Sequence, residues 1–258
     1  MTAVAAGGRS YALLADGTTI EIRPAGPGDR AAVQRFHEVM SPGNLYLRFF
    51  SMSKRAAEEE ARRVSRPPGP GHAALLALLG DRVAGVASYE RTGAEGEAEV
   101  AFAVADDLHG RGIATLLLEH LVSVAQARHV RVFTAQTLPE NIAMLRVFAE
   151  AGLSVQRRLT GDVVELTMPI PRAAALGADS LYLDAVAGRE RRAGVASLAP
   201  LLAPRSVAVV GASRRPRSIG REILLNIRDA GFAGTLHAIN PHVGDIDGVP
   251  CLPSVAAL

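Results

Sequence analysis

Two short glycine-containing turns are candidate anion sites in this chain. One reads HGRG over residues 109–112 and the other VGAS over residues 210–213, and a helical pattern follows each. The first N–H groups of a helix have no partner within it, and the helix dipole adds partial positive charge there. In the first turn, Gly110 and Gly112 allow close backbone approach and Arg111 offers a charge-assisted donor. Both turns are candidate phosphate sites, although glycine turns between a strand and a helix are also common structural features.

Two carboxylates lie upstream of the first turn, in the alternating segment GEAEVAFAVADD over residues 96–107. The period of two puts Glu97 and Glu99 on one side of a strand. The other side carries the apolar residues Ala98, Val100, Phe102 and Val104. A carboxylate can act as a general base toward an amine, which is mostly charged at neutral pH because its pKa is about 10.4. On the pattern alone, however, both glutamates are more simply solvent-facing residues.

The elements expected around these residues alternate strands with helices. Strand patterns occupy residues 10–25, 72–92, 96–107, 129–138 and 153–170, and the first two ranges are hairpins around glycine turns. Helical patterns occupy residues 26–41, 53–65, 112–126 and 139–152. Residues 40–51 start as a turn and continue with mixed aromatic and basic side chains. The expected order is a hairpin, helices, a meander, then helix, strand, helix and a strand pair.

This order and two motifs resemble the GNAT family of N-acetyltransferases. The family's pyrophosphate loop runs Gln/Arg-x-x-Gly-x-Gly/Ala, and the corresponding residues here are His109, Gly110, Arg111, Gly112, Ile113 and Ala114. A later helix of the family runs Asn-x-x-Ala/Ser, then Tyr, then Gly-Phe; the corresponding residues are Asn141, Met144, Phe148, Gly152 and Leu153. The resemblance covers about residues 10–170.

Two residues depart from the family pattern. His109 stands where Gln or Arg is usual, which should cost little because the loop binds mainly through backbone amides. Phe148 stands where many members have a tyrosine that protonates the departing CoA thiolate. Phenylalanine has no proton to give. A thiolate is nevertheless a tolerable leaving group, because the pKa of a free thiol is about 8.5, and water can protonate it in place of a side chain.

The resemblance implies the site and the cofactor. Acetyl-CoA is the expected co-substrate, and no metal is expected. Its expected contacts are Phe102, Ala103, Val104, His109, Gly110, Arg111, Gly112, Ile113, Ala114 and Asn141. The protein-lysine branch of the family has its base in an AEVAF-like strand, which indicates Glu99 and leaves Glu97 as the more solvated carboxylate. A backbone N–H near Phe102 is expected at the oxyanion, and Tyr46, Arg48 and Phe49 are candidates for the acceptor entrance.

The second glycine turn belongs to a different pattern. Residues 201–241 resemble the start of the CoA-binding domain of NDP-forming acyl-CoA synthetases, through the segments PRSVAVVGAS, SIG and INP. The turn is not a dinucleotide G-x-G-x-x-G, because Ala212 and Ser213 follow Gly211 directly. Only one strand–helix–strand unit is evident, which cannot cover its own sheet. We expect a truncated domain, poorly ordered in isolation and without ligase activity, in which His237 and His242 are structural or solvated.

The expected fold class is α/β: a GNAT mixed twisted sheet flanked by helices, followed by a partial Rossmann-like unit. The expected domains are an acetyltransferase domain at 10–172, an Ala-rich helical linker at 173–199 and a truncated CoA-binding domain at 200–258. At 258 residues the chain is long enough for such an arrangement.

Composition excludes several other classes. The formal net charge of +2 is too small to indicate nucleic-acid binding, and a single cysteine, Cys251, excludes an internal disulfide framework. No apolar run reaches the length of a membrane span, and no secretion signal is evident at the N-terminus. A cytoplasmic protein without a membrane or nucleic-acid partner is expected.

The function expected from these observations is transfer of an acetyl group from acetyl-CoA to an amine, with protein lysine as the first choice of acceptor. A small-molecule amine is an alternative acceptor. A non-catalytic acyl-CoA sensor that regulates an attached synthetase is an alternative function, favoured by Phe148 and His109.

Overall fold

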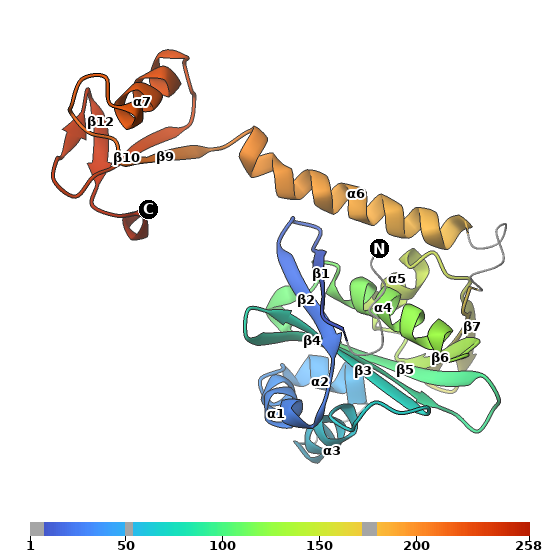
Figure 1. Ribbon diagram of the computed structural model, residues 1–258. Coiled ribbons are helices and arrows are strands. Elements are labelled where there is room, and N and C mark those ends of the chain that lie inside the picture. Colours follow the sequence, from blue (N-terminus) through green and yellow to red (C-terminus); the bar gives the residue numbers. More distant parts are fainter. Residues whose placement is uncertain (1–7, 50–53, 172–179) are drawn as a thin grey trace. The chain divides into compact units, whose positions relative to one another are not determined.

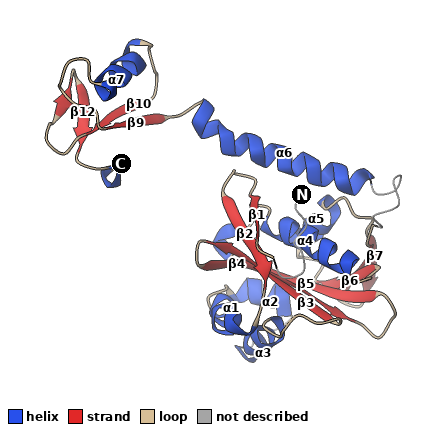
Figure 2. Ribbon diagram, viewed as in Figure 1, coloured by secondary structure: helices blue, strands red, loops and turns tan. Residues whose placement is uncertain are grey.

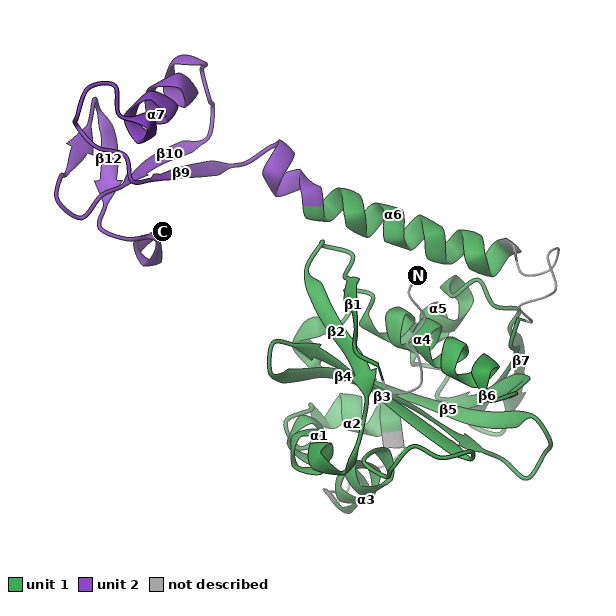
Figure 3. Cartoon of the chain, viewed as in Figure 1, with its two compact units in different colours: residues 1–197 green, residues 198–258 purple. Residues whose placement is uncertain are grey.

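A computed structural model describes residues 8–49, 54–171 and 180–258. The chain divides into two compact units, one that ends at Ser197 and one that comprises Leu198–Leu258 (Figure 3). Each unit has its own hydrophobic core.

An eight-stranded sheet forms the centre of the first unit, in the order β1-β2-β3-β4-β5-β6-β8-β7 (Figure 2). Its strands are β1 (Ser10–Leu13), β2 (Thr19–Pro24), β3 (His72–Leu79), β4 (Arg82–Arg91), β5 (Glu97–Val104), β6 (Val132–Thr137), β7 (Gln156–Thr160) and β8 (Val163–Pro169). All neighbours are antiparallel except β5 and β6, which are parallel. Both expected hairpins are present, because each joins two strand-forming runs through a short glycine turn. The mixed sheet confirms the expected fold class.

Helices cover both faces of this sheet (Figure 1). They are α1 (Arg30–Glu38), α2 (Pro42–Phe49) and α3 (Lys54–Val64) on one face, and α4 (Ile113–Ala127) and α5 (Ile142–Glu150) on the other. The helical face expected at 112–126 is confirmed, since Ile113, Leu117 and Leu121 are buried. Helix α4 packs so tightly on β4 that a Cβ at Gly85 would lie 2.9 Å from Ile113.

The parallel strands β5 and β6 are paired only at their N-terminal ends. The register joins Glu97, Ala98 and Glu99 of β5 to residues 132–134 of β6. Beyond these three pairs, each strand continues without the other as its partner, β5 to Val104 and β6 to Thr137. The divergence opens the centre of the sheet.

Helix α6 (Ser180–Leu202) lies in the range expected to be a linker, but its first part packs on the first unit. Tyr182 and Val186, one helical turn apart, are buried in that unit's core. Arg189 forms an ion pair with Glu119 of α4 and donates a hydrogen bond to the carbonyl oxygen of Glu150 at 3.0 Å. Apolar residues at helical spacing therefore make α6 part of the first unit as far as Ser197, whereas the start of the expected linker, 173–179, lies outside the described residues.

The second unit holds a sheet in the order β11-β12-β10-β9. Its elements are β9 (Ser206–Val210), α7 (Ile219–Asp229), β10 (Thr235–Ile239), β11 (Asp245–Ile246) and β12 (Val249–Leu252). The expected count of two strands was wrong, because β11 and β12 are too short to give a clear alternating pattern. A small core surrounds Leu224 and Ala238, while Ile219 and Val210 remain largely exposed.

Among the described residues, no helix has the length and apolar character needed to span a membrane. Across the same ranges, no cluster of three or more His, Cys, Asp or Glu side chains is arranged to hold a metal ion.

Candidate active site

A cavity of about 500 Å³ lies where β5 and β6 separate. Four segments line it besides these strands: α2, the turn before α4, the first residues of α4, and α5. All but one of the residues expected to bind the cofactor line this cavity: Phe102, Ala103, Val104, His109, Gly110, Gly112, Ile113, Ala114 and Asn141. The expected base, Glu99, lines it too. The fold thus brings together residues spread over about forty positions of sequence.

The first glycine turn has the backbone that its sequence predicted. Gly110 and Gly112 both have positive φ, +74° and +87°, which glycine adopts without steric cost. Helix α4 begins directly after Gly112, so its unpaired N–H groups lie at the cavity. The His109 side chain is held by the carbonyl oxygen of Val104, 3.0 Å from its Nε2 atom. The arrangement suits a pyrophosphate group bound by backbone amides and the helix dipole.

Arg111 is the expected cofactor contact that the structure places elsewhere. Its Nε donates to Asp16 Oδ2 at 3.0 Å, its Nη2 forms an ion pair with the same carboxylate, and Nη2 also donates to Thr18 Oγ1 at 3.0 Å. The carboxylate of the β1–β2 turn thus holds the guanidinium, and Arg111 is not among the cavity's lining residues in the described chain. The expectation that Arg111 reaches toward the cavity therefore differs from the structure.

The two carboxylates of β5 have different surroundings. Glu99 is exposed and lines the cavity, on the strand face opposite Val100 and Phe102. Glu97 is half-buried, and its Oε1 accepts a hydrogen bond from Thr92 Oγ1 at 3.1 Å. The expectation that Glu97 is the more solvated of the two was wrong, because the loop before β5 folds over it.

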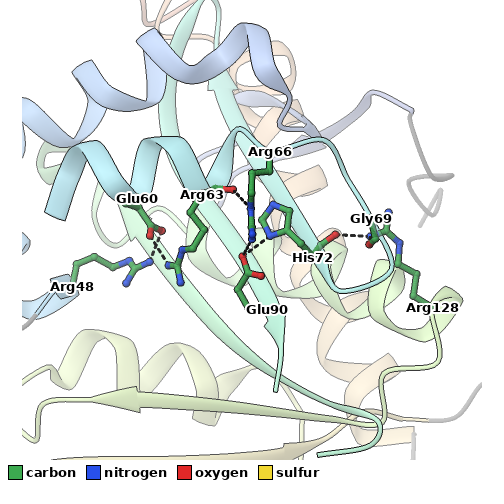
Figure 4. Close-up of polar contacts among 8 residues, drawn as sticks. All are labelled: Arg48, Glu60, Arg63, Arg66, Gly69, His72, Glu90 and Arg128. Carbon is green, nitrogen blue, oxygen red and sulfur yellow. Dashed lines mark hydrogen bonds and ion pairs between the residues drawn. The ribbon is translucent and has the colours of Figure 1, made fainter. Parts of the chain in front are cut away.

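A buried charge cluster lies on the same side of the sheet as Glu99. Glu60 of α3 is 6% exposed and pairs with Arg48 of α2 at 2.6 Å and with Arg63 at 2.5 Å (Figure 4). Burial by itself would raise the pKa of Glu60, but the two guanidinium groups lower it overall. Arg48 also lines the cavity; burial lowers its pKa, and the charge of Glu60, followed by the smaller effect of Glu99, acts in the opposite sense. A guanidinium held by Glu60 therefore lies on the wall of the cavity near Glu99.

The opposite side of the cavity is largely apolar. Phe148 of α5 is 1% exposed and packs edge-on against Phe102, with ring centroids 5.8 Å apart. Asn141 caps α5, since its side-chain oxygen accepts the N–H of Met144 at 3.1 Å. Asn141 also lines the cavity, and its side-chain amide nitrogen can donate hydrogen bonds.

Sequence reasoning missed several lining residues. Asn44 lines the cavity and donates to the carbonyl oxygen of Val104 at 3.0 Å. Ser41, whose Oγ accepts the N–H of Asn44 at 3.3 Å, and Pro42 are helix-start signals that could have predicted α2. Of the entrance candidates, Arg48 lines the cavity and Tyr46 does not.

The side chain of Phe49, the third entrance candidate, lies outside the described residues. Thr137 also lines the cavity, yet it is 2% exposed and its Oγ1 has no hydrogen-bond partner among the described residues. It follows Phe133 and Ala135 at a spacing of two, a pattern that predicts an inward-facing position.

Comparison with known proteins agrees with this geometry. Residues 40–153 match the Acetyltransferase (GNAT) family, and residues 205–257 match the CoA binding domain. The solved GNAT domain of S. lividans PAT is 34% identical, with a TM-score of 0.58, and the match covers 62% of this chain and 96% of that one. The chain belongs to the GNAT family. It is an N-acetyltransferase that uses acetyl-CoA.

Two curated relatives match parts of the chain. Acetyltransferase Pat of Mycolicibacterium smegmatis is 33% identical over 152 residues, which are 57% of this GNAT protein and 45% of Pat. An ADP-forming acetate–CoA ligase of Archaeoglobus fulgidus is 46% identical over 55 residues, which are 21% of this chain and 8% of the ligase. The chain thus spans less than half of Pat and less than a tenth of the ligase. The two resemblances expected from the two glycine turns are both confirmed.

Proposed function

We propose that this acetyltransferase modifies lysine side chains of proteins, with Glu99 as the general base. The observation that carries the proposal is the position of Glu99 in the cavity at the divergence of β5 and β6. The base and the cofactor-binding turn thus face one space, which is what direct transfer between two bound substrates requires.

The cofactor end of the site is proposed to be the turn at Gly110 and Gly112. Their positive φ angles and the start of α4 leave backbone N–H groups available to the pyrophosphate of acetyl-CoA. The acetyl-bearing arm would then lie between the separated strands, beside Phe102 and Asn141. A backbone N–H of β5 near Phe102 would stabilise the oxyanion as the thioester is attacked.

The acceptor end of the site is proposed to be the space between Glu99 and α2. A lysine ammonium must lose a proton before it can attack, at a cost of about 4–5 kcal/mol at pH 7. Glu99 would accept that proton, directly or through a water molecule. Arg48, on the same wall, is a fixed cation that disfavours a charged amine and favours the neutral nucleophile.

The leaving group is proposed to depart without a protein acid. Phe148 is apolar, buried and packed on Phe102, so it cannot protonate the CoA thiolate. A thiolate is stable enough to leave unaided or to be protonated by water, since the pKa of its thiol is about 8.5.

The proposal is tested with Glu99→Gln. Radiolabelled acetyl-CoA is supplied with lysine-bearing proteins, and both acetyl transfer and acetyl-CoA binding are measured. Transfer should fall by about 10²-fold or more, the range for loss of a general base, while acetyl-CoA binding persists. Glu97→Gln is the matched control, because Glu97 lies on the same strand but bonds Thr92; it should change transfer less than threefold.

Two outcomes would overturn parts of the proposal. If Glu99→Gln transfers acetyl at the wild-type rate, another group is the base. If small amines are acetylated efficiently and no protein is, the acceptor class is a small-molecule amine and the lysine assignment fails.

A further inference from the structure

The β1–β2 turn touches the proposed pyrophosphate loop through several bonds. Asp16 holds the guanidinium of Arg111, the middle residue of that loop, and Thr18 accepts a further bond from it. The backbone is tied as well, since the N–H of Ala15 donates to the carbonyl oxygen of Arg111 at 3.3 Å. The contact therefore fixes both the side chain and the main chain of the loop.

Asp16 is prepared for this contact by its own turn. Its Oδ1 accepts the backbone N–H of Thr18 at 3.0 Å. Hydrogen bonds from Thr18, the backbone one first, and the pairing with Arg111 lower the pKa of Asp16 to about 2. Asp16 is therefore a carboxylate with a fixed orientation at any physiological pH.

The other side of the same turn faces helix α6. Gly17 has φ of +83°, and a Cβ there would lie 2.5 Å from the backbone nitrogen of Ser197 and 2.8 Å from the carbonyl carbon of Ala196. Such distances do not occur for real Cβ atoms, so only glycine allows this approach. The turn thus lies between the loop at Arg111 and the late turns of α6.

We propose that Asp16 is a positioning residue for acetyl-CoA, and that the β1–β2 turn couples the packing position of α6 to the conformation of the pyrophosphate loop. The inference rests on the proposed assignment of that loop. Its physical basis is a continuous series of contacts. Helix α6 limits the position of Gly17, the position of Asp16 depends on that of its neighbour Gly17, and Asp16 holds Arg111. A loop held in its binding conformation loses less conformational entropy when acetyl-CoA binds.

The test measures the dissociation constant of acetyl-CoA by calorimetry on the full chain, with no acceptor present. Asp16→Asn should raise it about five- to tenfold, the range for loss of one charge-assisted contact. Arg111→Gln should raise it similarly, and the double variant should be no worse than either single one, since both remove one interaction. An unchanged or lower dissociation constant in Asp16→Asn overturns the inference.

The control for Asp16→Asn is Asp29→Asn, elsewhere in the first unit. Asp29 also accepts a turn N–H, that of Gly26 at 2.9 Å, and pairs with an arginine, Arg23, at 2.7 Å, but it does not line the cavity. Asp29→Asn should leave acetyl-CoA binding unchanged. If Arg111→Gln is much more damaging than Asp16→Asn and the effects add, Arg111 contacts the phosphate itself and the positioning role is wrong.

The link to α6 is tested with Gly17→Ala against Gly161→Ala. Gly161, in the β7–β8 turn, also has positive φ, +59°, but nothing lies within 4 Å of the position of its Cβ. Gly17→Ala should weaken acetyl-CoA binding at least threefold and Gly161→Ala should not, whereas equal effects contradict the link.

A further variant separates this inference from the proposed loop. Gly112→Ala strains the loop itself, at φ of +87°. If it leaves binding unchanged, the loop assignment fails. If it weakens binding and Asp16→Asn does not, only the positioning role fails.

Discussion

Arg48 on α2 donates a hydrogen bond to Glu60 on α3 at 2.6 Å, across twelve residues of sequence. The carboxylate is 6% exposed and the Arg48 side chain 15% exposed, so the pair is largely removed from water. Figure 4 shows the second guanidinium, Arg63, on the other carboxylate oxygen. This contact joins two helices beside the cavity and fixes the position of the cation that faces Glu99.

Glu60→Gln should therefore destabilise the protein strongly. The substitution leaves two guanidinium groups, one of them buried, without their carboxylate. Removing one partner of a buried ion pair costs about 3–5 kcal/mol, and the partial exposure of Arg63 places the expected loss near the lower end, about 3 kcal/mol. Urea denaturation at pH 7 measures it.

Glu59→Gln is the matched control on the same helix. Glu59 is 62% exposed and pairs with Arg55 at 2.9 Å, so its loss should cost less than about 0.5 kcal/mol. Equal effects of the two variants would show that burial of Glu60 does not matter to its pairing.

Local patterns predicted the turn at Gly110 and Gly112 because each requirement lies within a few residues: positive φ, a preceding strand and a following helix. They also predicted that Glu99 and Phe102 face opposite ways. They did not predict the ion pair between Asp16 and Arg111, because the two residues are 95 positions apart and no neighbouring residue indicates the pairing. Contacts of this kind depend on where the β1–β2 turn lies relative to α4 once the sheet has formed.

The role of α6 shows the same limit. Its Ala-rich sequence predicted a helix, but not that Tyr182 and Val186 would be buried against the first unit. The buried apolar residues of the described helix are Tyr182, Val186 and Ala193, too few over its length for a clear amphipathic pattern. A contact made by so few residues cannot be predicted from the helix alone, because it depends on the surface of the first unit against which the helix packs.

His37 should make stability depend on pH. Its ring is fully buried on α1, and burial lowers its pKa to about 4, although Glu60 acts in the opposite sense and Arg48 and Arg63 reinforce the lowering. The unfolded chain, with a histidine pKa of about 6.5, binds the proton first as pH falls. Stability is therefore complete above pH 6.5 and falls as pH drops toward 4, by about 2 kcal/mol at pH 5.

Urea denaturation between pH 7.5 and 5 tests the effect of His37. His37→Gln should flatten the pH dependence, whatever its effect on stability at pH 7. His242, which is exposed, provides the control His242→Gln, and that variant should keep the wild-type slope. A wild-type protein that is equally stable at pH 7.5 and pH 5 would contradict the assignment.

Gly152→Ala should release α6 from the first unit. Gly152 has φ of +76°, and a Cβ there would lie 2.8 Å from the Cβ of Ala185 and from the carbonyl oxygen of Leu181. Left-handed geometry alone costs alanine about 1–2 kcal/mol, and displacement of α6 adds to it. Gly80→Ala is the control, at φ of +58° with no atom within 4 Å of the Cβ position.

Hydrogen exchange is the measurement for Gly152→Ala. Amides of residues 181–189 should exchange faster in this variant than in Gly80→Ala, because the helix has lost its packing. Equal exchange in both variants would mean that the close approach at Gly152 can relax without moving α6.

Thr137→Val should stabilise the protein, contrary to the usual effect of a substitution in a core. Thr137 is 2% exposed, and its Oγ1 has no partner among the described residues, so folding removes the hydroxyl from water without replacing its hydrogen bond. Valine keeps the shape and the β-branching that suit β6. The expected gain is about 1 kcal/mol in the free energy of unfolding, measured in urea.

The companion variant Thr137→Ser makes the Thr137 test decisive. Serine keeps the hydroxyl and removes the methyl group, so it should destabilise by about 1 kcal/mol. Opposite signs for the two variants are what an unpartnered hydroxyl in an apolar position requires. If Thr137→Val instead lowers stability by more than about 0.5 kcal/mol, the hydroxyl is satisfied in solution and its contact contributes to folding.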